Sequence, residues 1–111
     1  MTDANAEHYT YRVRWSAEDA AYIGTVAEMP SLSWAAETQF DAFVGIRALV
    51  AEVLDDMKAS GETPPEAIAD RSYSGKFLVR LTPEAHRQLV IDAAEQNVSL
   101  NRLAASRLVG A

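Results

Sequence analysis

The sequence contains no cysteine among its 111 residues. Disulfide bonds, thiolate metal sites and cysteine nucleophiles are therefore excluded together. Long apolar runs are also missing, because no stretch approaches the roughly 18 apolar residues that a membrane helix needs. Residues 1–7 lack the basic start and apolar middle of a signal peptide. We expect a cytoplasmic protein without a membrane partner.

Histidine is scarce, and His8 and His86 are too far apart in the sequence to suggest a metal site or a catalytic triad. Carboxylates are plentiful, but none falls in the middle of an expected buried strand, as a two-magnesium site would require. The candidate carboxylates are expected in loops or turns, at a helix cap or on a polar helix face: Glu18, Asp19, Glu28, Asp41, Asp55 and Asp56. We predict that the chain is not an enzyme and holds no metal or cofactor.

Charge is distributed unevenly along the chain. The net charge is −6, which alone argues against a nucleic-acid binder. Residues 1–72 carry 13 acidic and 5 basic side chains, or −8, whereas residues 73–111 carry 3 and 5, or +2. Such asymmetry indicates two roles, one facing an anion and one facing a basic partner.

The first part of the chain has the pattern of strands followed by a helix. Apolar and polar residues alternate over 9–16, and β-forming residues fill 21–27 and 32–37. Aromatic residues in these strands are more typical of a core than of a base-stacking platform, because the surrounding charge is negative. Thr38 is a suitable N-cap for an amphipathic helix that ends near Ser60, before Gly61. We predict a β-β-β-α domain over residues 1–62.

Residues 63–74 carry paired prolines and little periodicity, so they are expected to form a linker, with a possible short strand near Ala67. Residues 76–81 alternate strictly, with basic and apolar side chains on opposite sides of an extended chain. Two short helices follow, one capped by Thr82 with a stop at Asn97, and one capped by Ser99. A strand and two short helices cannot bury their apolar faces alone, so residues 75–111 are expected to dimerise.

This order of strand, helix and helix resembles the ribbon-helix-helix DNA-binding fold, in which two strands pair and enter the major groove. The resemblance implies that Lys76, Leu78 and Arg80 face the groove. Leu78 is expected either to contact a thymine methyl or to contribute only weak base readout. The amides of Ser99, Leu100 and Asn101 open a helix and are expected to hold a phosphate. Each assignment has a plainer alternative. Residues 76–81 would form an ordinary edge strand, and Ser99 would serve only as a helix cap.

Nearly the whole chain, from about Tyr9 to Leu108, is similar to the HicB family of antitoxins. The resemblance rests on the turn at Pro30, the helix capped by Thr38, and the stretch Ser74 to Leu81, in that order. It implies an α+β protein with a partial RNase H-like amino-terminal domain and a ribbon-helix-helix tail.

In function, the resemblance implies a type II antitoxin that neutralises a small basic HicA-like RNA-cleaving toxin and represses its own operon by binding operator DNA. The expected assembly is a homodimer or a higher oligomer. Two alternatives remain open. One is a stand-alone repressor whose amino-terminal domain senses a ligand or oligomerises, and the other is a protein-binding module whose ribbon only dimerises.

Overall fold

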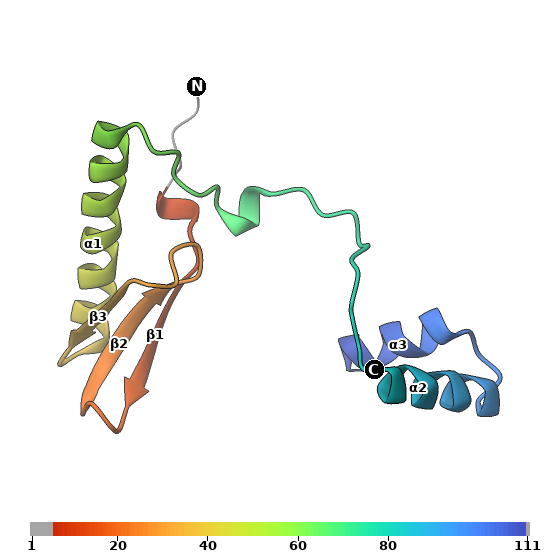
Figure 1. Cartoon of the computed structure of the whole chain (residues 1–111). Helices are drawn as coiled ribbons and strands as arrows, with labels where there is room; N and C mark the ends of the chain where they lie inside the picture. The colour runs from red at the N-terminus through yellow and green to blue at the C-terminus, as the bar shows by residue number, and fades with distance from the viewer. Residues whose placement is uncertain (1–5, 111) are drawn as a thin grey trace. The chain divides into compact units, whose positions relative to one another are not determined.

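The computed structural model describes residues 6–110 and divides them between two compact units that part between Tyr73 and Ser74. Each unit is described by itself. The chain is of the α+β type, with a three-stranded antiparallel sheet followed by helices (Figure 1). No helix in the described part of the chain has the length and apolar content needed to cross a membrane.

The sheet of the first unit consists of β1 (Tyr11–Ser16), β2 (Ala21–Val26) and β3 (Ser33–Ala36) in the order β1-β2-β3. All three expected strands are present, although each is shorter than expected, the second by one residue. Tyr9, expected to begin the first strand, lies before it and is buried. Both strand pairs are antiparallel, so the alternation of side chains gives the sheet two distinct faces.

Helix α1 (Gln39–Ser60) covers one face of the sheet. Its predicted ends are confirmed: the Thr38 hydroxyl accepts a hydrogen bond from the Asp41 amide at 3.0 Å, and Gly61 adopts a left-handed φ of 78°. The helix lies close to the sheet where glycine permits it. A Cβ on Gly24 would lie 2.6 Å from the Ala42 carbonyl oxygen, and one on Gly45 would lie 2.0 Å from the Trp34 indole.

The core of the first unit lies between this helix and the sheet. Val26, Ile46 and Val50 are its largest fully buried side chains. The tryptophans are more exposed than a core assignment predicts, at 54% for Trp15 and 44% for Trp34. Trp15 lies on β1 and Trp34 on β3, the two edge strands, so each has a neighbouring strand on one side only.

The segment expected to be a linker is partly packed against the first unit. Ala67 is 2% exposed and belongs to the core cluster. The short strand expected near it is instead a 3-10 turn, η2 (Ile68–Asp70). Another 3-10 turn, η1 (Ala6–His8), lies against it, and His8 Nδ1 is 2.8 Å from a carboxylate oxygen of Asp70.

Four further hydrogen bonds hold this segment and the residues around it. The Tyr9 hydroxyl donates to the Pro65 carbonyl at 2.5 Å. The carboxylate of Glu28 accepts from the amides of Thr10 and Ile68 at 2.8 and 2.9 Å, and it also accepts from the Thr10 hydroxyl at 3.2 Å. Glu28 therefore joins the chain before β1, the turn after β2 and the segment after α1.

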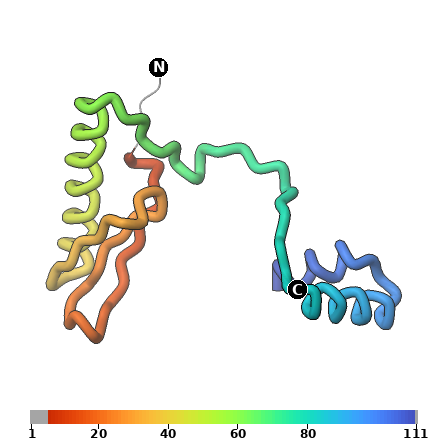
Figure 2. Tube along the Cα trace, viewed as in Figure 1, coloured from red at the N-terminus to blue at the C-terminus, as the bar shows by residue number. Residues whose placement is uncertain are grey.

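The second unit contains α2 (Pro83–Glu95) and α3 (Leu100–Val109), which lie side by side (Figure 2). The predicted caps are confirmed, because the hydroxyls of Thr82 and Ser99 accept hydrogen bonds from amides three residues later at 3.2 and 3.0 Å. Asn97 has a φ of 56° and stops α2 as expected. The Val98 amide then donates to the Ala93 carbonyl at 3.0 Å, which satisfies the helix end.

Candidate nucleic-acid interface

The segment 76–81 is extended in the structure and precedes α2 directly (Figure 1). No strand is assigned to it within this single chain, since a strand is defined by a pairing partner. Gly75, with a φ of 84°, turns the chain into the segment, and the Ser74 hydroxyl accepts a hydrogen bond from the Lys76 amide at 3.1 Å. Both edges of the segment thus lack a partner strand within the described residues.

Both faces of this segment are exposed in the single chain. On the apolar side, Phe77 is 77% exposed and Val79 and Leu81 are each 49% exposed. On the other side, Lys76 and Arg80 are exposed and flank Leu78, which is 79% exposed. Apolar side chains this exposed require cover, because burying each one contributes about 1.5–3 kcal/mol. Pairing that covers Phe77 and its neighbours would leave Lys76, Leu78 and Arg80 outward.

The cations of the second unit differ in whether they make an ion pair. Arg107 donates to the Asp92 carboxylate at 3.0 Å. Hydrogen bonds from Gln88 and then from Arg107 lower the pKa of Asp92 below its ordinary value. In contrast, Lys76 and Arg80 make no ion pair among the residues described. Their charge is therefore available to an anionic partner.

The start of α3 offers backbone donors. The Ser99 hydroxyl is used as a cap for the Arg102 amide, which leaves the amides of Leu100 and Asn101 at the first positions of the helix. The positive end of the helix dipole lies here, and it favours an anion such as phosphate. Asn101 is exposed and Leu100 is half-buried.

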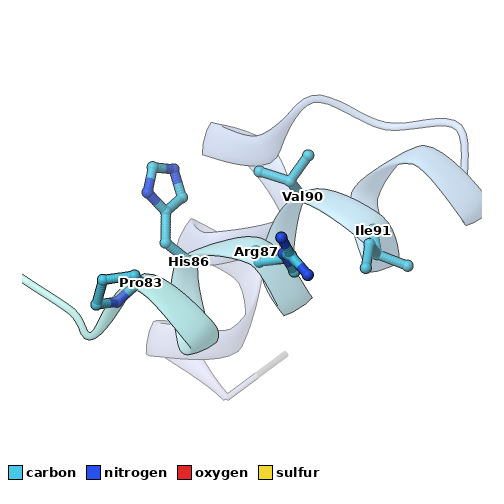
Figure 3. Close-up of a pocket in the computed structure, with 5 residues that line it drawn as sticks. All are labelled: Pro83, His86, Arg87, Val90 and Ile91. Carbon is cyan, nitrogen blue, oxygen red and sulfur yellow. The ribbon is translucent and has the colours of Figure 1, made fainter.

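Helix α2 carries an exposed, partly apolar face. Pro83, Arg87, Val90 and Ile91 line a shallow, open pocket together with His86 (Figure 3). The spacing of positions 83, 87, 90 and 91 places them on one helical face. Val90 and Ile91 are 47% and 42% exposed, so this face also lacks cover within the chain.

Within its own chain the second unit has a sparse core. Ala93 and Leu103 are its buried apolar residues. Large apolar side chains on the tail segment and both helices are more than 40% exposed: Phe77, Leu78, Val79, Leu81, Val90, Ile91, Leu108 and Val109. Monomeric proteins seldom expose so much apolar surface in so small a unit.

The first unit presents acidic side chains instead. Glu52, Asp55 and Asp56 lie three and four positions apart on α1 and are exposed, so they share a face of this helix. Metal binding is a separate question: among residues 6–110, no three potential ligands of the His, Asp and Glu types gather into a metal-binding group.

In comparison with known proteins, the model of the HicB family matches residues 58–108. The match begins in the last turn of α1 and spans α2 and nearly all of α3. This part of the chain, a little under half of its 111 residues, is therefore similar to the HicB family. No curated protein matches the chain, and no solved structure does.

Proposed function

We propose that the chain is a homodimeric antitoxin that binds operator DNA through its second unit and a small basic HicA-like toxin through its first. The observation that carries the proposal is the segment 76–81, where exposed basic and apolar side chains alternate. Two copies pair these segments as an antiparallel ribbon with Phe77, Val79 and Leu81 inside. Lys76, Leu78 and Arg80 then face the major groove, which admits such a ribbon.

The helices complete this dimer. The uncovered stripe of α2 and the exposed end of α3, at Leu108 and Val109, pack against the second copy. The amides at Leu100 and Asn101 bind a backbone phosphate and fix the register of the ribbon on the duplex. This site is a binding surface, and the proposed function includes no catalysis.

Charge supports the division of roles. The first unit carries −8 and displays Glu52, Asp55 and Asp56 on one face of α1, which favours a basic protein partner. The second unit carries +2 and leaves Lys76 and Arg80 unpaired among the described residues, which favours a phosphate backbone.

The DNA-binding part is tested with the double variant Lys76→Ala/Arg80→Ala and a mobility-shift assay on the DNA upstream of the gene. Loss of each groove contact costs about 1–3 kcal/mol, so affinity should fall by more than about a hundredfold. The variant Arg12→Ala/Arg14→Ala removes the same charge from the first unit and should bind normally. Equal affinity of wild type and Lys76→Ala/Arg80→Ala would refute the groove assignment.

The phosphate site is tested with Asn101→Asp. A carboxylate at this position stabilises the helix start but repels phosphate, so DNA affinity should fall while the thermal stability of the unit is kept. An unchanged affinity would mean that Ser99 and its neighbours serve only as a helix start.

The toxin-binding part is tested by asking whether a short reading frame for a basic protein lies next to the gene and by co-expressing the chain with that protein. Relief of growth arrest by the wild type and by Lys76→Ala/Arg80→Ala would support toxin binding by the first unit. Operator binding without any relief would favour the stand-alone repressor.

A further inference from the structure

The longer free edge of the sheet belongs to β1, since β3 is shorter and β2 lies between them (Figure 1). The Ala27 amide donates to the Thr10 carbonyl at 2.9 Å, and the β1–β2 register continues without a break from there. In an antiparallel ladder, alternate residues point their backbone groups to opposite sides. The N–H and C=O groups of Tyr11, Val13 and Trp15 therefore point away from β2, along an edge that no described strand covers.

The side chains along this edge divide into two chemistries. Arg12 and Arg14 lie on the open face of the sheet, opposite the face that α1 covers, and both are exposed. The side chains of Tyr11, Val13 and Trp15 lie on the α1 side. There the ring centres of Tyr11 and Phe43 lie 5.9 Å apart in an edge-on arrangement, and those of Trp15 and Tyr22 lie 5.1 Å apart.

The α1 side of the edge is an uncovered apolar surface. Trp15 is 54% exposed and Phe43 is 39% exposed. The Arg47 guanidinium lies over the rings of Tyr11 and Phe43, at 5.3 and 5.7 Å from their centres. An added strand would therefore meet cations on one side and aromatic rings on the other.

A second copy of β1 is a poor occupant. Antiparallel self-pairing centred on Arg12, Val13 or Arg14 places an arginine of one copy directly opposite an arginine of the other. Like charges at directly opposite positions destabilise a strand pair, and charged residues on an edge are a known means of preventing self-association. The charge pattern thus favours a partner strand with acidic side chains on the open face.

We propose that the free edge of β1 binds an extended segment of a partner protein, in which acidic side chains over Arg12 and Arg14 alternate with apolar side chains over Trp15 and Phe43. Backbone groups of Tyr11, Val13 and Trp15 supply the hydrogen bonds, and the two rows of side chains supply specificity. This surface differs from the acidic face of α1, and its use does not depend on DNA binding by the second unit.

The test is an NMR titration of the full-length chain with a blocked peptide of alternating glutamate and valine. A lysine–valine peptide of equal length is the control. The glutamate peptide should perturb the amides of Tyr11, Val13 and Trp15 more than the other amides of the sheet. It should bind roughly tenfold more tightly than the lysine peptide, since opposite charges stabilise and like charges destabilise cross-strand pairs.

Two variants separate edge pairing from general attraction. Val13→Pro removes one outward N–H at an edge position, where proline is tolerated, and should abolish binding of the peptide. Arg12→Glu/Arg14→Glu keeps every backbone donor and should reverse the preference, so that the lysine peptide binds more tightly. If Val13→Pro does not fold, the reversed peptide preference of Arg12→Glu/Arg14→Glu still tests the proposal.

Three results would overturn the proposal. The first is that neither peptide binds, and the second is that both peptides bind equally to wild type and to the charge-reversed variant. The third is that the β1 amides are already protected from exchange without peptide and that Val13→Pro lowers the oligomeric state, which would identify a second copy as the occupant.

Discussion

Replacing Glu28 with glutamine tests the first unit at the residue that joins three of its segments. Its carboxylate accepts two amide hydrogen bonds, from Thr10 and Ile68 at 2.8 and 2.9 Å. Glutamine keeps one acceptor oxygen, but its NH2 group would face one of these N–H donors, so one bond is lost and the other becomes neutral. Hydrogen bonds to charged groups contribute about 1.5–3 kcal/mol. Because Glu28 is only half-buried and solvent offsets part of the loss, we expect Glu28→Gln to cost about 1–2 kcal/mol.

The assay is urea unfolding followed by tryptophan fluorescence. Both tryptophans, Trp15 and Trp34, belong to the first unit, so their signal reports on this unit alone. The matched control is Glu52→Gln, which makes the same charge change on the exposed face of α1. Surface substitutions of this kind usually change stability by less than about 0.5 kcal/mol. Amide exchange at Thr10 and Ile68 should be faster in Glu28→Gln than in the control.

The effect of pH gives a second signature. Burial raises the pKa of Glu28, but hydrogen bonds from the amides of Thr10 and Ile68 outweigh it and hold the pKa below its ordinary value of 4.5. A carboxyl whose folded pKa is lowered stabilises the fold above its unfolded pKa, and this contribution is lost as the pH falls through the folded pKa. The gap between wild type and Glu28→Gln should therefore be constant near neutral pH and shrink below about 4.5. Equal stability of Glu28→Gln and Glu52→Gln, or a gap that persists in acid, would refute the role of Glu28.

Three further predictions concern packing, a helix end and assembly. Gly45→Ala would place a Cβ 2.0 Å from the Trp34 indole, so the first unit should lose about 1–3 kcal/mol in urea unfolding; an unchanged midpoint would contradict this close approach. Asn97→Ala should destabilise the second unit by about 1 kcal/mol, since its φ of 56° is unfavourable for alanine; Asn97→Gly should keep the thermal midpoint. If the second unit dimerises as proposed, its thermal unfolding, followed by circular dichroism, should shift upward with protein concentration, whereas the tryptophan signal of the first unit should not; two concentration-independent transitions would contradict a dimeric tail.

Local chemistry explains which parts of the fold could be predicted from the sequence. The ends of the helices at Thr38, Gly61, Asn97 and Ser99 depend on capping groups within a few residues, and all are found where expected. The strands were predicted from alternation, and their ends were less accurate because the pairing partner decides where a ladder stops. The exposure of Trp15 follows from its place on the edge strand, which alternation alone does not reveal.

The misread features depend on contacts between residues far apart in the sequence. Glu28 was interpreted as a surface carboxylate before a turn, yet it binds the Ile68 amide 40 residues later. Ala67 was placed in a linker, but it fills the core, because a small apolar residue carries no periodic signal when it stands alone. At the candidate interface, the alternation of residues 76–81 was legible from sequence. Their strand pairing stays a prediction, because a ribbon of this kind forms between chains.

The two units differ in how much of their apolar surface is covered by residues of the same unit, and this contrast bears on function. The first unit covers one sheet face with α1 and fixes its final segment through Glu28, Tyr9 and Ala67. The second unit buries just Ala93 and Leu103 among its apolar side chains in the described chain. If the second unit dimerises as proposed, the free energy of association becomes part of its folding free energy, so its stability depends on protein concentration. Under the proposed function, the amount of protein would then control DNA binding, whereas partner binding by the first unit would not require that dimer.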